Sequence, residues 1–217
     1  PARRFYEADI VVSAVDPSIT FAKLLSSTAL VDDVRKKVLL RDAKSASMKI
    51  NMTLSRLPCL RAVGASGDSA QHQGTVHISP SVAYVLDAHR MHKDGKYHEA
   101  KPVLEITFPS AVDETLAPKG SHVMNIFVQF YPYEADYAGV GSPNSGRLFC
   151  NEVVLPVLRE YYLDIDECIV GLQVLTPKDI EAAAIAVADA MTRLGYTDVK
   201  ISGIDQERRR PTTTKAS

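Results

Sequence analysis

The segment Met48–Leu54 constrains the fold more than any other, because its apolar and polar residues alternate strictly. The segment reads MKINMTL. A period of two places the apolar side chains on one face of a β-strand and Lys49, Asn51 and Thr53 on the other. A strand of this kind belongs to a sheet that is buried on one side only. Such half-covered sheets are typically antiparallel.

Four further segments favour strands. Val103–Phe108 and His122–Tyr131 give the clearest patterns, and the thirteen residues between them, PSAVDETLAPKGS, make too long a link for a tight hairpin. Thr75–Ile78 is a shorter strand. Ala8–Ser13 is a β-branched run that ends before Asp16 and Pro17, which predicts a buried strand followed by a turn.

The helices are predicted from apolar periodicity and from capping residues. Asp16 caps a first helix, and Thr176 caps a long alanine-rich helix that ends at Gly195. Pro156 lies inside the fourth helix and is expected to kink it or delay its start. The predicted helices are Pro17–Leu25, Val31–Leu40, a helix opened by Ser79 and Pro80 that runs to about Arg90, Leu148–Tyr162 and the helix after Thr176. Together the elements predict an α+β or mixed α/β fold, with an antiparallel sheet covered by helices on one face.

Composition excludes several classes of function. The 217 residues carry 25 basic and 26 acidic side chains, a net charge of −1, which argues against a nucleic-acid partner. No apolar run approaches the roughly 18 residues that span a bilayer. The three cysteines form no CxxC pair, so a reducing compartment is expected. Because the sequence starts at Pro1, we expect a processed product, a fragment or an incomplete record.

The sequence contains no self-contained catalytic motif. It has no GxGxxG after a strand, no GxxxxGK[ST] and no GxSxG. Gly139, Gly141 and Gly146 lie in a loop with the wrong spacing, which favours a flexible turn. Cys150 follows Phe149 and is expected to be a small buried hydrophobe rather than a nucleophile.

Two clusters of potential metal ligands are better explained as solvated surface. His89, His92 and Asp94 resemble a metal pair but fall at a helix end and in a lysine-bearing loop. The acidic cluster of Asp164, Asp166 and Glu167 lacks the glycine and the spacing of an EF-hand. No metal site is therefore predicted. The basic run 208–210 is expected to belong to a solvated tail.

Five stretches in order resemble the phytoene-desaturase-like FAD-dependent oxidoreductases. They are residues 8–25, 49–58, 71–79, 102–133 and 169–181, of which PVLEITFPSAVDETLAPKGSHVMNIFVQFYPY at 102–133 is the longest. The resemblance implies the substrate domain of a flavin amine-oxidase-like or phytoene-desaturase-like enzyme. It assigns residues 1–25 to an edge strand and helix of the flavin domain and 26–175 to the substrate domain. Residues 176–204 form a divergent helix and short strand, and 205–217 a disordered tail.

The resemblance also bears on the cofactor. The family's N-terminal glycine-rich dinucleotide motif and its C-terminal glycine-rich flavin segment have no counterpart in this sequence. We therefore expect no cofactor in this chain alone, and FAD only if a partner completes the site. In that case Ser13, Val15 and Pro17 are the remnant that would contact the flavin.

The polar strand residues Asn51, Asn125 and Gln129 are the candidate substrate-facing residues. In a complete relative this sheet would line an elongated apolar tunnel. The alternative, an exposed sheet face without a ligand, is at least as well supported by the sequence. No catalytic residue is carried over, because no catalytic motif of the family falls on a matching position.

Three hypotheses follow. The favoured one is a non-catalytic accessory subunit, derived from an oxidoreductase, in a larger assembly with other protein chains. The resemblance implies a mitochondrial location, and otherwise a cytoplasmic one. The alternative is the substrate-binding part of a split or fragmentary FAD-dependent oxidoreductase that acts on a lipid-like substrate. The third is a small-ligand binding domain that uses the former substrate pocket.

Overall fold

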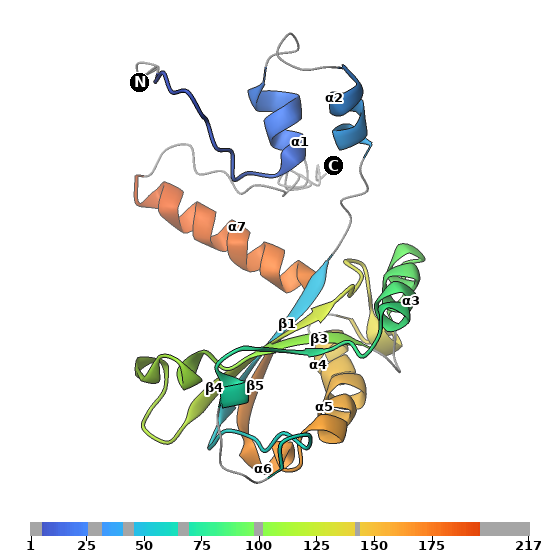
Figure 1. Ribbon diagram of the computed structural model, residues 1–217, viewed down its shortest axis with the longest axis vertical. Helices are drawn as coiled ribbons and strands as arrows, with labels where there is room; N and C mark the ends of the chain where they lie inside the picture. Colours follow the sequence, from blue (N-terminus) through green and yellow to red (C-terminus); the bar gives the residue numbers. More distant parts are fainter. Residues whose placement is uncertain are drawn as a thin grey trace, which may run out of the picture. The chain divides into compact units, whose positions relative to one another are not determined.

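The computed structural model describes residues 6–25, 32–40, 46–64, 70–97, 102–141 and 144–195 (Figure 1). The chain divides into two compact units. One comprises Pro1–Ala43 together with Ile185–Ser217, and the other is Lys44–Ala184. The long helix α7 (Pro177–Arg193) contributes to both units. Each unit is described by itself.

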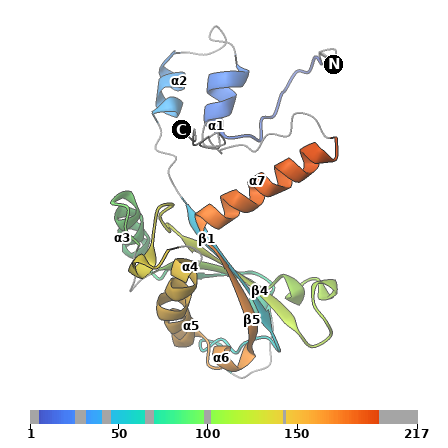
Figure 2. The ribbon, with the colours of Figure 1, turned by 180° about the vertical axis from the view of Figure 1, so that it is seen from behind.

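The larger unit is built on a five-stranded sheet in the order β2-β3-β4-β1-β5 (Figures 1 and 2). Every pair of neighbouring strands is antiparallel. The strands are β1 (Ser47–Leu54), β2 (Thr75–Ile78), β3 (Val103–Thr107), β4 (His122–Gln129) and β5 (Ile169–Leu175). The predicted α+β class with an antiparallel sheet is confirmed.

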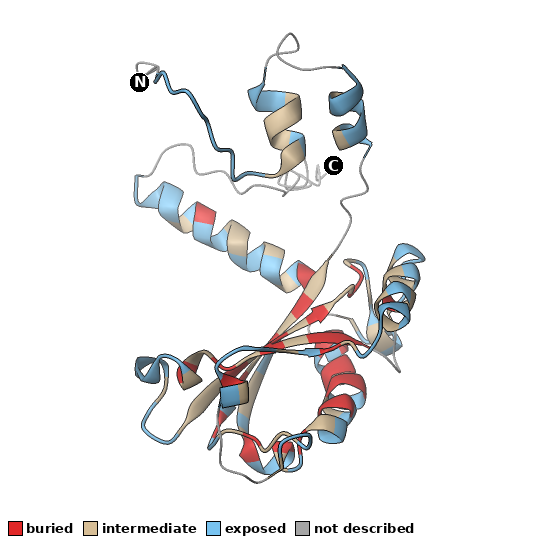
Figure 3. Ribbon diagram, in the orientation of Figure 1, coloured by how far each residue is buried: buried red, intermediate tan, exposed pale blue. Residues whose placement is uncertain are grey.

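The alternation in β1 sets the register of the whole sheet. Ile50 lies opposite Ile126 of β4, and Met52 lies opposite Met124, so that one continuous apolar face forms. All four apolar residues of β1 are buried, because this face meets the helices of the unit (Figure 3). At about 25 cal/mol for each Å² of apolar surface removed from water, this face is the main source of the unit's stability.

Helices that follow β4 cover the apolar face. They are α4 (Asn144–Phe149), the π-helical η7 (Cys150–Val154) and α5 (Leu155–Tyr161), with the short α6 (Ile165–Cys168) after them. Their buried residues pack with the sheet in a single core. The helix was predicted to begin at Leu148 but begins at Asn144. Pro156 does not delay the start; it follows η7, a wider turn in which the Leu155 N–H bonds the carbonyl of Cys150.

Close packing explains the glycine in the first turn of α4. A Cβ atom on Gly146 would lie 2.7 Å from Thr176 Cγ2 and 3.3 Å from Val174 Cγ1. The glycine therefore lets α4 approach the end of β5. The prediction of a flexible turn was wrong at this position, although Gly139 and Gly141 do lie in turns with positive φ.

The predicted cap of α7 is present, whereas α3 (Val82–Lys93) begins after the predicted opening at Ser79 and Pro80 and is capped by Ser81. Ser81 Oγ accepts a hydrogen bond from the Tyr84 N–H at the start of α3. Thr176 and Asp179 form a capping box on α7, in which the Asp179 carboxylate accepts from the Thr176 N–H at 2.9 Å. Gly195 closes α7 with φ 89°.

Short 3₁₀ turns complete the larger unit. They are η3 (Ala70–His72), η4 (Pro109–Ala111), η5 (Glu114–Leu116) and η6 (Tyr137–Gly139). Of these, η4 and η5 lie in the long link between β3 and β4 that the sequence excluded from a tight hairpin.

The smaller unit contains α1 (Pro17–Ile19), the π-helical η1 (Thr20–Leu24) and α2 (Asp32–Leu39). Asp16 caps α1 as predicted, accepting from the Ser18 N–H at 2.8 Å. The predicted strand at Ala8–Ser13 does not form. Ile10, Val11 and Val12 are each more than 80% exposed, because no described strand provides a ladder for them.

Several boundaries predicted from the sequence stay predictions. The assignment of residues 1–25 to a flavin domain and of 26–175 to a substrate domain is one of them. The short strand before residue 204, the tail 205–217 and the basic run 208–210 lie outside the described residues.

Candidate functional site: the open face of the sheet

The second face of the sheet carries polar side chains and is only partly covered. We call it the open face, and Asn51, Asn125 and Gln129, the three predicted substrate-facing residues, all lie on it. Each of the three is half-buried. The strand alternation therefore brings together residues that lie up to 78 positions apart. By the register of the strands, the open face consists of Ser47, Lys49, Asn51, Thr53, Thr75, His77, Val103, Glu105, Thr107, Val123, Asn125, Phe127, Gln129, Gly171, Gln173 and Leu175.

A row of polar side chains crosses the middle of the open face. Thr107 lies opposite Asn125, Asn125 opposite Asn51, and Asn51 opposite Gln173. Asn51 Nδ2 donates to Gln173 Oε1 at 3.0 Å. We call Thr107, Asn125, Asn51 and Gln173 the amide row. The Asn125 side chain makes no hydrogen bond to the part of the chain that the structure describes, so its donors and acceptor are available.

Gln129 lies near one end of the face and its amide is already used. Ser47 Oγ donates to Gln129 Oε1 at 2.9 Å, and Gln129 Nε2 donates to Glu105 Oε2 at 3.2 Å. The structure thus separates the predicted residues into two kinds. Asn51 and Asn125 lie in the central row, whereas Gln129 serves a network that joins β1, β4 and β3.

Between these polar groups lies the phenyl ring of Phe127. Lys49 lies opposite Phe127, and its ammonium group is 4.6 Å from the centre of the ring. Such cation–π contacts contribute on the order of 0.5–1 kcal/mol at exposed sites. Phe127 and Val123 give the face apolar surface beside the amides, a combination suited to a ligand or a polypeptide with both kinds of surface.

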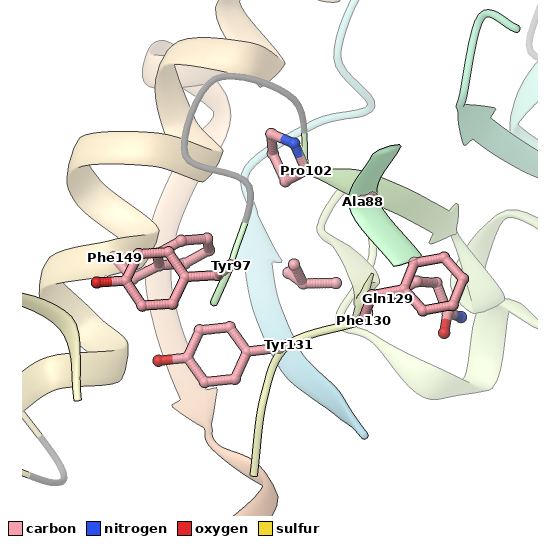
Figure 4. A pocket seen from close by; sticks show the side chains of 8 residues that line it. Ala88, Tyr97, Pro102, Gln129, Phe130, Tyr131 and Phe149 are labelled. Atoms are coloured by element: carbon pink, nitrogen blue, oxygen red, sulfur yellow. The ribbon is translucent and has the colours of Figure 1, made fainter. Parts of the chain in front are cut away.

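An aromatic cluster lies just after the end of β4, on the helix-covered side of the sheet (Figure 4). Phe130 has φ 60°, a conformation rare for a bulky residue, and it reverses the side-chain alternation at the end of β4. Tyr131 consequently stacks on Tyr97 with ring centres 6.0 Å apart, and meets Phe149 edge-on at 5.2 Å. The space among them is only about 10 Å³, so this cluster is packed rather than a ligand cavity.

The candidate flavin-contacting residues lie in the smaller unit. Ser13 Oγ is hydrogen-bonded to Thr20 Oγ1 at 2.7 Å, Val15 is 43% exposed, and Pro17 begins α1. Pro17 has no N–H to offer at the start of a helix that continues through α1 and η1 to Leu24. That these three residues contact a flavin stays a prediction.

The other clusters singled out by the sequence have structural roles. His89 meets the Phe130 ring edge-on at 5.4 Å, and His92 Nδ1 lies 3.2 Å from the Phe130 carbonyl. No group of three or more potential ligands gathers among the described residues in a way that would hold a metal ion.

Ion pairs hold the acidic cluster that precedes β5. Arg56 Nη2 lies 2.9 Å from both Asp164 and Glu167. Arg159 binds Asp166 through two hydrogen bonds, and these lower the pKa of Asp166. The cluster therefore ties α5 and α6 to the segment after β1 rather than holding a cation.

Two of the three cysteines, Cys150 and Cys168, are buried and unreactive. Burial raises the pKa of the Cys150 thiol to about 12, so the thiol stays protonated at neutral pH. Burial raises the pKa of Cys168 to about 11. The prediction that Cys150 is a buried hydrophobe is confirmed.

Sequence reasoning missed several polar residues of the open face, among them Glu105, Thr107 and Gln173. Glu105 and Thr107 alternate with the buried residues Leu104 and Ile106. The period of two in β3 therefore already indicated that both lie on the open face. Gln173 could not be assigned to a face in this way. β5 carries apolar residues on both faces, so its sequence does not alternate.

The fold and the open face define a class: an α+β domain with a helix-covered antiparallel sheet whose other face offers amides and a phenyl ring. No family model matches the chain. The chain is similar to proteins named pyridine nucleotide-disulfide oxidoreductase domain-containing protein 2 from Rattus norvegicus and Mus musculus, with 30% identity to each over 177 residues. Each alignment covers 79% of this chain and 30% of the relative.

The chain thus spans about 30% of the length of the curated relatives that it matches. The similarity supports an oxidoreductase-derived domain and confirms the closeness to these relatives. The wider assignment to the phytoene-desaturase-like family stays a prediction. No helix in the described ranges is long and apolar enough to cross a bilayer.

Proposed function

We propose that this domain is a non-catalytic accessory part of an oxidoreductase-type assembly, and that its open face is the surface that the rest of the assembly covers. The observation that carries the proposal is the amide row. Asn125 and Asn51 lie directly opposite each other at the centre of the face, and Asn125 has no bonding partner among the described residues. A half-buried amide whose donors and acceptor are unused can form hydrogen bonds with a partner that covers it.

The chemistry of the amide row favours binding over reaction. The row consists of three carboxamides and one hydroxyl, none of which titrates near neutral pH. The buried thiols of Cys150 and Cys168 lie in the core, away from the open face. A face of this kind positions a substrate, a cofactor or a neighbouring chain, and leaves electron transfer to a bound cofactor.

FAD is the cofactor that the sequence resemblance implies. Two observations argue against a flavin cradle in this chain alone: the Ser13 hydroxyl is bonded to Thr20, and Pro17 offers no N–H at the start of the α1–η1 helix. We therefore place no chemical step on this chain. If FAD takes part, its pyrophosphate is held by another segment or another chain.

A second candidate function is the substrate-binding part of an FAD-dependent oxidoreductase that acts on a lipid-like substrate. The apolar surface of Phe127 and Val123 beside the amide row favours this alternative, because an elongated apolar molecule needs such surface. We also propose a mitochondrial location for either assembly, an expectation that rests on the resemblance alone.

The test is purification of the chain from its native source under conditions that keep complexes intact. Mass spectrometry identifies the chains that co-purify, and an absorption spectrum reports flavin through its band near about 450 nm. The proposal predicts stoichiometric partner chains. Flavin together with one partner that carries a glycine-rich dinucleotide motif would favour the second candidate. A lone monomer would contradict both.

A further inference from the structure

A cleft lies on the side of the sheet opposite the open face, at the start of β4. It has a volume of about 680 Å³, within the roughly 300–1,000 Å³ range of small-molecule sites. Its lining includes Leu57, Ser110, Glu114, Lys119, Ser121 and His122. His122 precedes the buried Met124 by two residues, so it shares the helix-covered side of the sheet rather than the open face.

The floor of the cleft is a hydrogen-bonded pair. Ser110 is only 2% exposed, and its hydroxyl oxygen accepts a hydrogen bond from the Val123 N–H at 2.9 Å. The same oxygen lies 3.1 Å from His122 Nδ1. The serine therefore fixes the imidazole, whose other nitrogen is left to contact a ligand.

A buried histidine behind this floor has an unused ring nitrogen. His72 is 4% exposed, and its Nε2 donates to the Pro58 carbonyl at 2.9 Å. Its Nδ1 has no hydrogen-bond partner in the described part of the chain. Pro58 follows Leu57 of the cleft wall, and the His72 ring meets that of Phe108, two residues before Ser110, edge-on at 4.8 Å. The end of the core beside the cleft thus holds an unsatisfied polar group, which is uncommon in a folded protein.

Two opposite charges stand at the rim. Glu114 and Lys119 both line the cleft and are exposed, and neither forms an ion pair with a described residue. Cleft walls that carry one anion and one cation favour a ligand with the complementary pair of charges.

From these features we propose that the cleft binds a small zwitterion of the α-amino-acid class. The ligand's ammonium group faces Glu114 and its carboxylate faces Lys119. A short polar side chain reaches the Ser110–His122 floor. Leu57 supplies an apolar wall, so the cleft offers nonpolar contact as well as the two charges.

Titration calorimetry on the full chain tests this with L-serine and L-glutamine as probes. Ethanolamine carries only the ammonium group and glycolate only the carboxylate, so the pair separates recognition of both charges from recognition of one. We expect the zwitterions to bind, and each single-charge compound to bind roughly tenfold more weakly, about the contribution of one charged contact.

Variants at the rim complete the test. Glu114→Gln and Lys119→Met should each weaken zwitterion binding roughly tenfold. Lys93→Met removes an exposed lysine on α3, outside the cleft, and should leave binding unchanged. The proposal is overturned if neither amino acid binds up to about 10 mM, a limit near the weakest specific affinities. It is also overturned if the single-charge compounds bind equally well, or if the rim variants bind like the unmodified chain.

Discussion

Asn51 and Asn125 lie directly opposite each other on the neighbouring antiparallel strands β1 and β4. Both side chains lie on the open face, with Thr107 opposite Asn125 on one side and Gln173 opposite Asn51 on the other. The pair is the natural target for separating the proposed role of the face from its contribution to the fold.

Replacing both asparagines with aspartate should weaken assembly while the domain stays folded. Asn51→Asp and Asn125→Asp keep the side-chain shape but place two negative charges opposite each other on a surface that a partner must cover. We expect partner chains to be lost from the native complex, as measured by quantitative mass spectrometry. Gln73→Glu, on an exposed residue of a loop, is the matched control. Equal recovery of partners with both kinds of variant would count against the role of the face.

Gly146→Ala should destabilise the larger unit by about 1–3 kcal/mol. The new methyl group would lie 2.7 Å from Thr176 Cγ2, so α4 or the end of β5 must shift. Urea unfolding measures the change. Gly74→Ala is the control, because a Cβ there meets nothing within 4 Å. A Gly146→Ala variant as stable as the control would show that the α4–β5 contact is looser than described.

Loss of the capping box should destabilise α7. Thr176→Ala removes the hydroxyl that binds Asp179, at an expected cost of about 0.5–2 kcal/mol in the free energy of unfolding. Thr176→Ser keeps the hydroxyl and loses only the methyl group, so its cost isolates the packing contribution. If serine and alanine cost the same, the cap contributes nothing beyond packing.

The three thiols should react at very different rates. Cys59 is partly exposed, whereas Cys150 and Cys168 are fully buried and burial raises the pKa of both. A thiol reagent at neutral pH should modify one cysteine rapidly in the native protein and all three in denaturant. Cys59→Ser should abolish the fast phase. Rapid modification of two or more thiols in the native state would contradict the described core.

His122 should make the fold less stable in acid. Burial and the nearby His72 lower the pKa of His122 in the folded state, so protonation favours unfolding. Its contribution is complete above the unfolded-state pKa of about 6.5 and declines as the pH falls below that value. Urea unfolding at pH 7.5 and pH 5 should show a smaller acid loss for His122→Asn than for the unmodified chain. An identical loss in both would exclude this origin.

Strict alternation made the sheet predictable, and local context explains where prediction failed. The alternation in Met48–Leu54 predicts one buried apolar face. It places Asn51 on the opposite, polar face, because a period of two allows no other arrangement. Ala8–Ser13 has the composition of a buried strand, yet a strand also needs a partner, and the sequence of a segment does not supply one. The start of α4 was missed because Gly146 looks like a turn residue until its contact with Thr176 is known.

The candidate site was predictable in part for the same reason. Asn51, Asn125 and Gln129 were found by alternation within their own strands. That Gln129 is bonded to Glu105, and Asn51 to Gln173, depends on strand order and register, which only the folded sheet defines. The cleft at Ser110 and His122 left no sequence signal, because it joins a long loop to the segment after β1.

Covering of the open face is tested most directly by thiol labelling at Thr53. This residue is exposed on the open face of β1. In a Cys59→Ser background, Thr53→Cys should react with a maleimide at least roughly tenfold more slowly in the native assembly than in the isolated chain, as expected when a surface is buried by a partner. Gln73→Cys in the same background should react equally in both. Equal rates for Thr53→Cys in the assembly and in the isolated chain would contradict the proposal that the assembly covers this face.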